Sequence, residues 1–463
     1  MSSTAAAPGD TGAFLVRTRL SVMMFLQYAV WGIWLPVLAI YLGAKKEAGG
    51  LGFDGGQIGM ILGLAGSVGA VAAPFIAGQV ADRFLPAERA LGILLVLGGV
   101  INLLLANADT YASFLLLSVL YSVAYMPTLS LSNSIAMSNL RNENVDFPRV
   151  RVWGTIGWIV ASAVFPLVWL QTNHVFTTLP WFLEGTPKPN ATALIPDALR
   201  VSGYLSFAYA AYAFMVLPYT PPKGSSKNPL AFIEAFALLR YRGVLVLCTA
   251  AIIISMIHNV YFLRTGPWLT TVGFTSANAP AAMTVGQMVE IITLAALGWF
   301  ISKLGFKSVL TIGALAYFLR FADFAWTTPD NRNLAYLGIA LHGFCYAFFF
   351  AAAFLYIDRS APRDARHSAQ TAFGIAILGL GPVLAGVYNG FLDKVATAPA
   401  AGAAAPVGLA GWWQGALASM GVTLTPGALS YPAVWWTEAA IGAAVFVLML
   451  VAMPGVPPKA ADE

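Results

Sequence analysis

The chain contains about twelve apolar stretches of roughly 20 residues, the length that an α-helix needs to cross the hydrocarbon core of a bilayer. Of its 463 residues, 59% are hydrophobic and only 10% are charged, whereas a soluble domain carries about 25% charged residues. This composition argues against a soluble enzyme, a nucleic-acid binder or a disordered scaffold. In lipid the backbone must satisfy its own hydrogen bonds, so we expect an all-α integral membrane protein. The expected spans begin near Phe14, Gln57, Ala90, Tyr111, Arg151, Val201, Val244, Asn278, Val309, Leu334, Ala369 and Ala433.

The positions of the basic residues predict the orientation. Arg17 and Arg19 stand directly before the first apolar run, which indicates an uncleaved first span rather than a signal peptide. With twelve spans, 17 of the 25 Lys and Arg residues fall in the even-numbered connections and the two tails, and only seven fall on the opposite side. Basic residues favour the cytoplasmic side, so both termini are expected in the cytoplasm. Cys248 and Cys345 lie within apolar runs, and we expect neither a disulfide framework nor a metal or cofactor site.

A repeated motif predicts two related halves. Gly78, Asp82 and Arg83 follow the second span, and 220 residues later Gly298 and Lys303 follow the eighth span with the same spacing. A small Gly permits close helix contact and a basic residue can bond the end of a helix, which suits a rocking hinge. We therefore expect a six-helix bundle at 1–220, a cytoplasmic linker at 221–242 and a second six-helix bundle at 243–463. This pseudo-symmetric arrangement resembles the major facilitator superfamily.

Polar residues inside the spans are few, because each costs about 3 kcal/mol at a helix centre. Gln287 and Glu290 in the eighth span share one helical face, and Glu290 is the most isolated acid of the chain. It is either a proton carrier or a structural carboxyl bonded to a neighbouring helix. In the tenth span His342 and Tyr346 also share a face, and His342 is a second candidate for a proton site, favoured over His258.

Other polar residues favour structural interpretations. Arg320 and Asp323 in the ninth span are three residues apart and are expected to neutralise each other. Glu438 lies near the outer end of the last span, from which it can reach the interface. The Pro-, Gly- and Ala-rich segments 171–200 and 393–432 are expected to be loops, with a short surface helix near Trp412 and Trp413.

The strongest local signature runs across the fourth and fifth spans. It consists of Ala124-Tyr-Met-Pro-Thr-Leu129 followed by Val150-Arg-Val-Trp-Gly-Thr-Ile-Gly-Trp158. Arg151, Thr155 and Trp158 form one stripe of a helix, which combines a cation, a hydroxyl and an aromatic ring. From the residues alone, Arg151 extends to the membrane interface and Trp158 packs within the bundle.

These runs resemble the nucleoside:proton symporter family of the major facilitator superfamily. Similar runs begin at Phe25, Trp31, Gln287 and Ser368, and their order and spacing are specific. The resemblance implies a central cavity between the halves. Its lining positions would correspond to Arg151, Thr155, Trp158, Asn259, Gln287, Glu290, His342 and Tyr346.

The chain departs from the family pattern in the tenth span. Tyr346 and Ala347 stand where the family has Phe-Asp, His342 stands where it has Tyr, and Trp158 replaces a Phe of the fifth span. An acid of the family is thus absent. Either Glu290 or His342 supplies the titrating group, or the coupling or the substrate differs.

The resemblance implies a mechanism. Trp158 or Tyr346 would stack on a nucleoside base, polar side chains would bond its sugar and base edges, and Glu290 would carry the proton. The expected partners are a nucleoside, protons and lipid, without nucleic acid, and the protein is expected to act as a monomer. The alternatives are a facilitator-superfamily transporter for a sugar or drug, an uncoupled nucleoside facilitator, and a membrane enzyme that uses the loop from Asp358 to His367.

Overall fold

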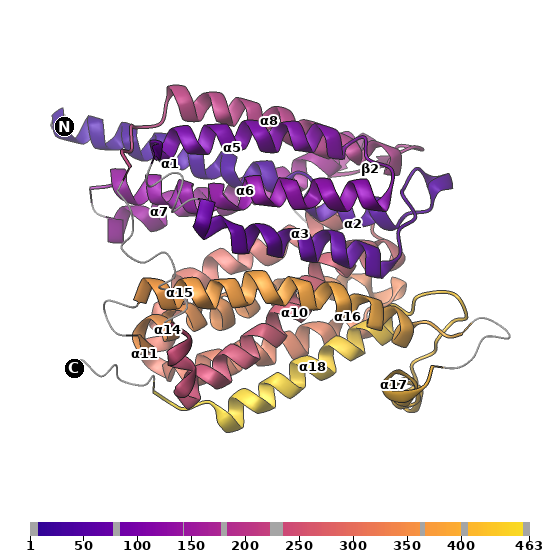
Figure 1. Cartoon of the computed structure of the whole chain (residues 1–463). Helices are drawn as coiled ribbons and strands as arrows, with labels where there is room; N and C mark the ends of the chain where they lie inside the picture. Colours follow the sequence, from indigo (N-terminus) through magenta and orange to yellow (C-terminus); the bar gives the residue numbers. More distant parts are fainter. Residues whose placement is uncertain are drawn as a thin grey trace, which may run out of the picture.

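The computed structural model describes residues 8–76, 84–141, 143–176, 183–222, 235–361, 366–399 and 406–456. Nearly all of these residues are helical, and the helices lie side by side along one common direction (Figure 1). The elements of the first half are α1 (Pro8–Gly32), α2 (Leu35–Gly43), η1 (Lys46–Ala48), α3 (Gly55–Phe75), α5 (Ala87–Leu105), α6 (Tyr111–Asn139), α7 (Glu143–Trp169), β1 (Gln171–Phe176), β2 (Leu183–Pro187), η3 (Thr192–Leu194) and α8 (Pro196–Met215).

The second half is also helical, and two of its helices continue into π-helical segments. Its elements are η4 (Ala235–Arg240), α10 (Arg242–Thr271), α11 (Asn278–Trp326), η5 (Pro329–Leu334), α12 (Ala335–Ala340), α13 (His342–Phe344), the π-helical η6 (Cys345–Ala351), α14 (Ala352–Ser360), α15 (Arg366–Ile375), the π-helical η7 (Ala376–Leu380), α16 (Gly381–Ala396), α17 (Gly408–Ser419) and α18 (Tyr431–Ala452).

The number of membrane-length helices agrees with the sequence. Ten helical segments of the described residues are long and apolar enough to cross a membrane. One of them, α11, holds two spans because Gly305 has φ 74° and ψ 166°, a conformation that interrupts the helix and favours glycine. Helix α8, with 20 residues, falls outside those ten but has the length of a span. The described chain thus supplies the twelve predicted helices, and the protein is a multi-pass membrane protein.

The helices of the first half form one layer and those of the second half form another (Figure 1). Their buried side chains form two hydrophobic clusters. One runs mainly from Leu20 to Leu217, and the other mainly from Leu238 to Met453. The division into bundles at 1–220 and 243–463 stays a prediction, and most of the proposed linker lies outside the described residues.

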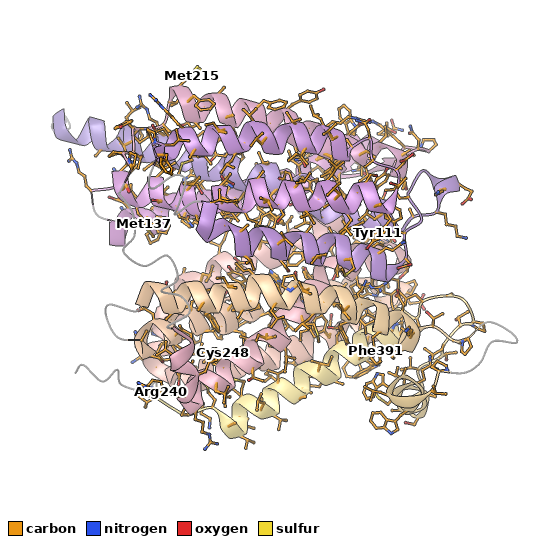
Figure 2. The ribbon with its side chains drawn as sticks, viewed as in Figure 1. Tyr111, Met137, Met215, Arg240, Cys248 and Phe391 are labelled. Carbon is orange, nitrogen blue, oxygen red and sulfur yellow. The ribbon has the colours of Figure 1, made fainter. Side chains whose placement is uncertain are left out.

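The two ends of the bundle differ. The first and last described helices begin and end at the same end, which we call the termini end, and the β1–β2 hairpin marks the opposite end, the hairpin end (Figure 1). Tyr111 and Phe391 lie at the hairpin end, and Met137 and Arg240 lie at the termini end (Figure 2). Helices α6 and α16 therefore run in opposite directions, as the predicted topology requires.

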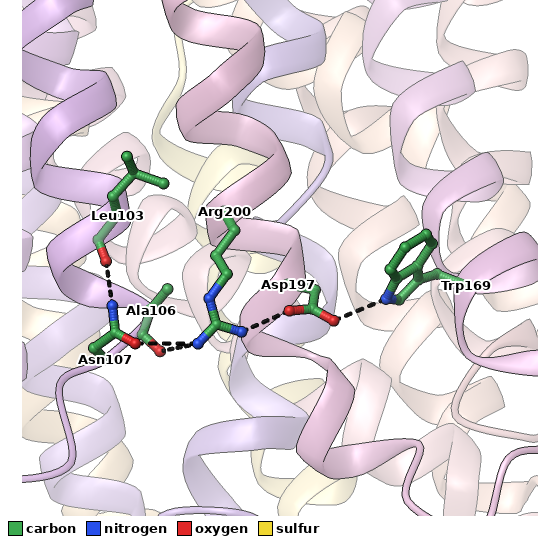
Figure 3. Close-up of polar contacts among 6 residues, drawn as sticks. All are labelled: Leu103, Ala106, Asn107, Trp169, Asp197 and Arg200. Carbon is green, nitrogen blue, oxygen red and sulfur yellow. Dashed lines mark hydrogen bonds and ion pairs between the residues drawn. The ribbon is translucent and has the colours of Figure 1, made fainter.

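Polar contacts join three helices at the hairpin end of the first half (Figure 3). Asp197 on α8 pairs with Arg200 at 2.6 Å and accepts a hydrogen bond from the Trp169 indole of α7 at 2.9 Å. Arg200 also donates to Asn107, next to the end of α5, at 3.1 Å. Aromatic and charged side chains are typical of the membrane–water interface.

The two long connections at the hairpin end are partly ordered. The segment 171–200, expected to be a loop, contains an antiparallel hairpin in which Gln171 pairs with Pro187 and Val175 pairs with Glu184. The expected surface helix near Trp412 and Trp413 is confirmed as α17.

Candidate functional site

The fifth-span stripe lies on α7, which packs closely against α1. A Cβ at Gly154 would lie 2.6 Å from the Tyr28 ring, and one at Gly157 would collide with the backbone of Phe25. The two glycines of the Val150–Trp158 run therefore allow this close approach. Arg151 donates from Nη2 to the Tyr28 hydroxyl at 2.7 Å, and its Cζ lies 4.2 Å from the Tyr28 ring centroid.

The remaining members of the stripe lie near the first helix as well. Trp158 meets Trp31 edge to face, with ring centroids 5.3 Å apart, and is half-buried. Thr155 is also half-buried. Arg151 is held inside the bundle by Tyr28, so the interpretation that it extends only to the interface is wrong.

The second half brings Glu290 next to His342 because α11 and α13 pack backbone to backbone. A Cβ at Gly343 would lie 2.6 Å from the Glu290 amide nitrogen, and one at Gly286 would lie 2.8 Å from the His342 Cβ. The His342 Nε2 lies 3.6 Å from the Glu290 Oε2. Tyr346 follows one turn later in η6, and π-helical turns of this kind occur frequently at functional sites.

Groups from both halves share one electrostatic environment. The Glu290 carboxyl interacts with the Arg151 guanidinium of the first half, and Tyr346 interacts with Glu290, Arg151 and Tyr28. Glu290 is largely buried, whereas Tyr346 is 36% exposed. The structure thus brings together Arg151, Glu290, His342 and Tyr346 at the junction of the two layers.

Two amide side chains of the candidate set differ in their bonding. Gln287 is buried, and its Oε1 has no hydrogen-bond partner. Asn259 donates from Nδ2 to the Ser255 carbonyl of its own helix at 2.8 Å, and no contact of the described residues joins it to the others. Gln287 is therefore a free acceptor, and Asn259 is a more distant candidate.

The predicted hinge is only partly visible. Gly78, Asp82 and Arg83 lie outside the described residues. Gly298 and Lys303 lie at the termini end of the first span of α11, and Lys303 is exposed. A Cβ at Gly298 would meet nothing within 4 Å, so the expected close helix contact at this glycine is wrong.

Two further expectations are corrected. Arg320 and Asp323 do not pair, because the Asp323 Oδ2 accepts the Gly338 backbone N–H at 3.0 Å. Arg320 instead contacts His342, with 3.2 Å between Nη1 and Nδ1. Glu438 does not reach the interface; it is fully buried, and neither of its carboxyl oxygens has a hydrogen-bond partner.

His258, the less favoured of the two histidine candidates, lies beside His342, whereas Tyr28 was not singled out from the sequence. His258 stacks on His342 with centroids 5.4 Å apart and contacts the Tyr317 hydroxyl through Nδ1 at 2.7 Å. Tyr28 belongs to the run that begins at Phe25, but the sequence did not indicate its contact with Arg151, because that contact depends on how α1 and α7 pack. Within the described residues, no group of three or more His, Cys, Asp or Glu could hold a metal ion.

A family model described as nucleoside H+ symporter matches residues 14–453. The chain belongs to this nucleoside H+ symporter family. The putative nucleoside transporter YegT of Escherichia coli (strain K12) is 32% identical over 375 residues, which span 79% of this chain and 82% of YegT. The nucleoside permease NupG of the same organism is 28% identical over 401 residues, 82% of this chain and 89% of NupG.

Solved structures of other transporters share the fold of this symporter family member. The crystal structure of a NupG variant superposes with a TM-score of 0.76 at 23% identity, covering 95% of this chain and all of that chain. A D-xylose–proton symporter superposes with a TM-score of 0.66 at 12% identity, covering 96% and 98%. The fold is that of the major facilitator superfamily, and the protein is a transporter rather than an enzyme.

Proposed function

We propose that this protein imports nucleosides together with protons across the cytoplasmic membrane. The observation that supports this proposal best is the cluster of Arg151, Glu290 and Tyr346, in which each layer of the fold contributes part of one polar, aromatic site. In a member of the nucleoside H+ symporter family, a buried acid facing a cation from the other half suits a site that binds a solute and a proton in turn.

The side chains match the chemistry of a nucleoside. Its flat base needs an aromatic face, and stacking on a ring such as Trp158 or Tyr346 contributes about 1 to 3 kcal/mol in single-strand binding proteins. The sugar hydroxyls and base edges need donors and acceptors. Arg151 and Thr155 provide donors, the free Oε1 of Gln287 provides an acceptor, and Asn259 would add an amide.

Glu290 is the proposed proton carrier. It is largely buried, lies 3.6 Å from the His342 Nε2 and is attracted by the Arg151 guanidinium of the other half, so its charge would affect how strongly the two halves attract each other. Moving one charge through 100 mV supplies about 2.3 kcal/mol, which allows roughly fifty-fold accumulation. One titrating carboxyl is therefore sufficient to couple nucleoside accumulation to protons, even though Ala347 stands where the family has an acid.

The contacts at the hairpin end support alternating access as part of this proposal. Helix α3 of the first half and α16 of the second half meet there through glycines, with a Cβ at Gly59 only 2.8 Å from the Gly386 carbonyl oxygen. Arg264 on α10 pairs with Asp393 on α16 at 2.5 Å, and Asn389 of α16 donates to the Gly55 carbonyl of α3. These contacts close the hairpin end, and rocking of the halves would open it.

The orientation completes the proposal. Basic residues concentrate in the connections and tails assigned to the termini end, so this end would face the cytoplasm of a bacterial inner membrane. The bundles at 1–220 and 243–463 would be the two rocking bodies, with hinge turns at Gly78, Asp82 and Arg83 and at Gly298 and Lys303.

The test is uptake of labelled uridine and adenosine into cells that express this protein, with and without a protonophore. We expect accumulation that collapses when the proton gradient is removed. The matched variant Glu290→Gln should abolish accumulation while nucleoside exchange across the membrane continues. Uptake that only equilibrates in the unchanged protein would contradict proton coupling, and no uptake by correctly inserted protein would contradict the nucleoside assignment.

A further inference from the structure

Arg320 is a buried cation without a carboxylate in direct contact. Its side chain is fully buried, and its Nε and Nη2 have no hydrogen-bond partner. Its Cζ lies 3.3 Å from the Tyr261 ring centroid, so an aromatic face covers the guanidinium. Because Asp323 bonds to Gly338 instead, the charge of Arg320 must be balanced elsewhere. A buried charge that lacks compensation is strongly destabilising.

The guanidinium bonds to the His342 ring, and the Tyr261 hydroxyl and the Cys345 thiol lie beside it. Arginine can only donate, so the His342 Nδ1 must accept the bond from Nη1 at 3.2 Å. This fixes the neutral tautomer of the imidazole, in which the proton sits on Nε2. That nitrogen lies 3.6 Å from the Glu290 Oε2, which is a close electrostatic contact but longer than a direct hydrogen bond. The three side chains thus form a chain that runs from Arg320 through His342 to Glu290.

The His342 ring is held in this arrangement by its neighbours. His258 and Tyr261 both stack on it, with centroids 5.4 Å and 5.3 Å away. Protonation of the His342 Nδ1 would replace the bond to Arg320 with repulsion between two cations. His342 is therefore suited to transmit charge and poorly suited to carry the transported proton.

We propose that Arg320, acting through His342, sets the pH at which Glu290 takes up and releases its proton, with His342 as a link and not the carrier. Arg320 is a positioning residue in this account, which rests on the proposed function for the role of the proton. The chain from Arg320 through His342, which we call the relay, would balance the negative charge of Glu290 from within the second half. Arg151 attracts the same carboxylate from the first half.

Charged and titratable groups from several helices surround the relay. Those facing it are Arg151 of α7, Tyr28 of α1, His258 and Tyr261 of α10, Tyr317 of α11, and Cys345 and Tyr346 of η6. Within this set Arg151 and Arg320 are the permanent cations. Arg151 acts on Glu290 directly, and in this proposal Arg320 acts on it through His342, so removing Arg320 removes the second of two charges that favour the ionised form.

The experiment measures Glu290 directly by infrared titration of the purified protein, taking as its signal the protonated-carboxyl band that Glu290→Gln abolishes. Arg320→Gln should move the midpoint of this band to higher pH by about one unit, because a nearby positive charge is lost. Arg320→Lys should stay near the unchanged protein. Arg332→Gln, which removes an exposed arginine at the hairpin end, is the control and should shift nothing.

Two substitutions of His342 separate a link from a carrier. His342→Gln can accept from Arg320 and reach toward Glu290 without a titrating ring. It should preserve the midpoint and the ratio of nucleoside uptake with the proton gradient to uptake without it, whatever its effect on nucleoside affinity. His342→Phe breaks the chain and should reproduce the shift of Arg320→Gln. An unchanged midpoint in Arg320→Gln would overturn the proposal, and so would a folded His342→Gln whose uptake no longer responds to the proton gradient.

The outcomes remain decisive if one part fails. Should Arg320→Gln not fold, the comparison of His342→Phe with His342→Gln decides whether the relay exists. Nucleoside exchange by the unchanged protein is measured in parallel. Its absence would contradict the proposed function, whereas the infrared titration would still establish or refute the relay.

Discussion

At the scale of single residues, Arg151 depends on Tyr28 in two ways, through a hydrogen bond at 2.7 Å and through the ring face at 4.2 Å. Tyr28→Phe keeps the ring and removes the hydroxyl, so it should weaken nucleoside binding by about 1 kcal/mol, roughly fivefold in the KM of uridine uptake. Tyr28→Leu removes both interactions and should cost more. Equal KM values for the two variants would show that the ring face contributes nothing.

Gln287 offers a second test, because its buried Oε1 has no partner within the protein. Gln287→Leu should raise the KM for uridine about tenfold, since a hydrogen bond to the substrate is lost, and should leave the Tm unchanged or higher. Gln27→Leu is the matched control. The Gln27 amide bonds to Thr128 at 2.7 Å and Tyr209 at 3.1 Å, so this change should lower the Tm. A fall in Tm for Gln287→Leu with normal uptake would exclude the substrate contact.

The sequence identified several residues of the candidate site but not the side chains that they contact. Arg151, Gln287, Glu290 and His342 stood out because polar groups are rare in apolar spans and similar runs occur in a known family. Their partners could not be assigned in this way. Whether Arg320 turns to Asp323 or to His342 depends on how the two spans of α11 pack against α13, and spacing along one helix does not report that packing.

At the scale of elements, the contact between α3 and α16 depends on small residues. A Cβ at Gly63 would collide with the Pro382 carbonyl oxygen, whereas a Cβ at Gly66, one turn along the same helix, would meet nothing within 4 Å. Gly63→Ala should therefore destabilise the protein by about 1 to 3 kcal/mol through overpacking. Gly66→Ala should be neutral or slightly stabilising, because alanine favours helix. Thermal unfolding followed by gel filtration compares the two, and equal Tm values would contradict the close packing.

The helices themselves were predictable, because their number follows from the length and spacing of apolar stretches. The details within them were not. Gly305 separates two spans within a single long helix, and the polar residues Ser302, Lys303, Lys307 and Ser308 mark the connection without showing that one glycine makes the break. The π-helical η6 carries Tyr346 in a stretch of ordinary apolar residues, and the β1–β2 hairpin forms in a segment without strand periodicity. These features arise from packing between elements rather than from local preference.

At the scale of the whole molecule, the two halves join through interactions that close one end. Arg264, Asn389 and Asp393 form a polar cluster within the second half, and Asn389 extends it to the Gly55 carbonyl of the first half. Opening the hairpin end must break this last bond and separate the glycine-lined faces of α3 and α16. The site around Glu290 would then become accessible from the opposite end of the bundle.

A disulfide across this contact tests whether separation of the halves is required for transport. A Cβ at Gly56 would lie 4.0 Å from the Gly390 Cα, and one at Gly390 would lie 3.8 Å from the Gly56 Cα, so cysteines at these two positions would be close neighbours across the contact. In the double variant Gly56→Cys and Gly390→Cys, oxidation should stop nucleoside uptake and reduction should restore it. Each single variant is a control, since Cys248 and Cys345 lie elsewhere in the second half. Full uptake by the oxidised double variant would show that the hairpin end stays closed throughout the cycle, and rocking of the two halves would have to be abandoned.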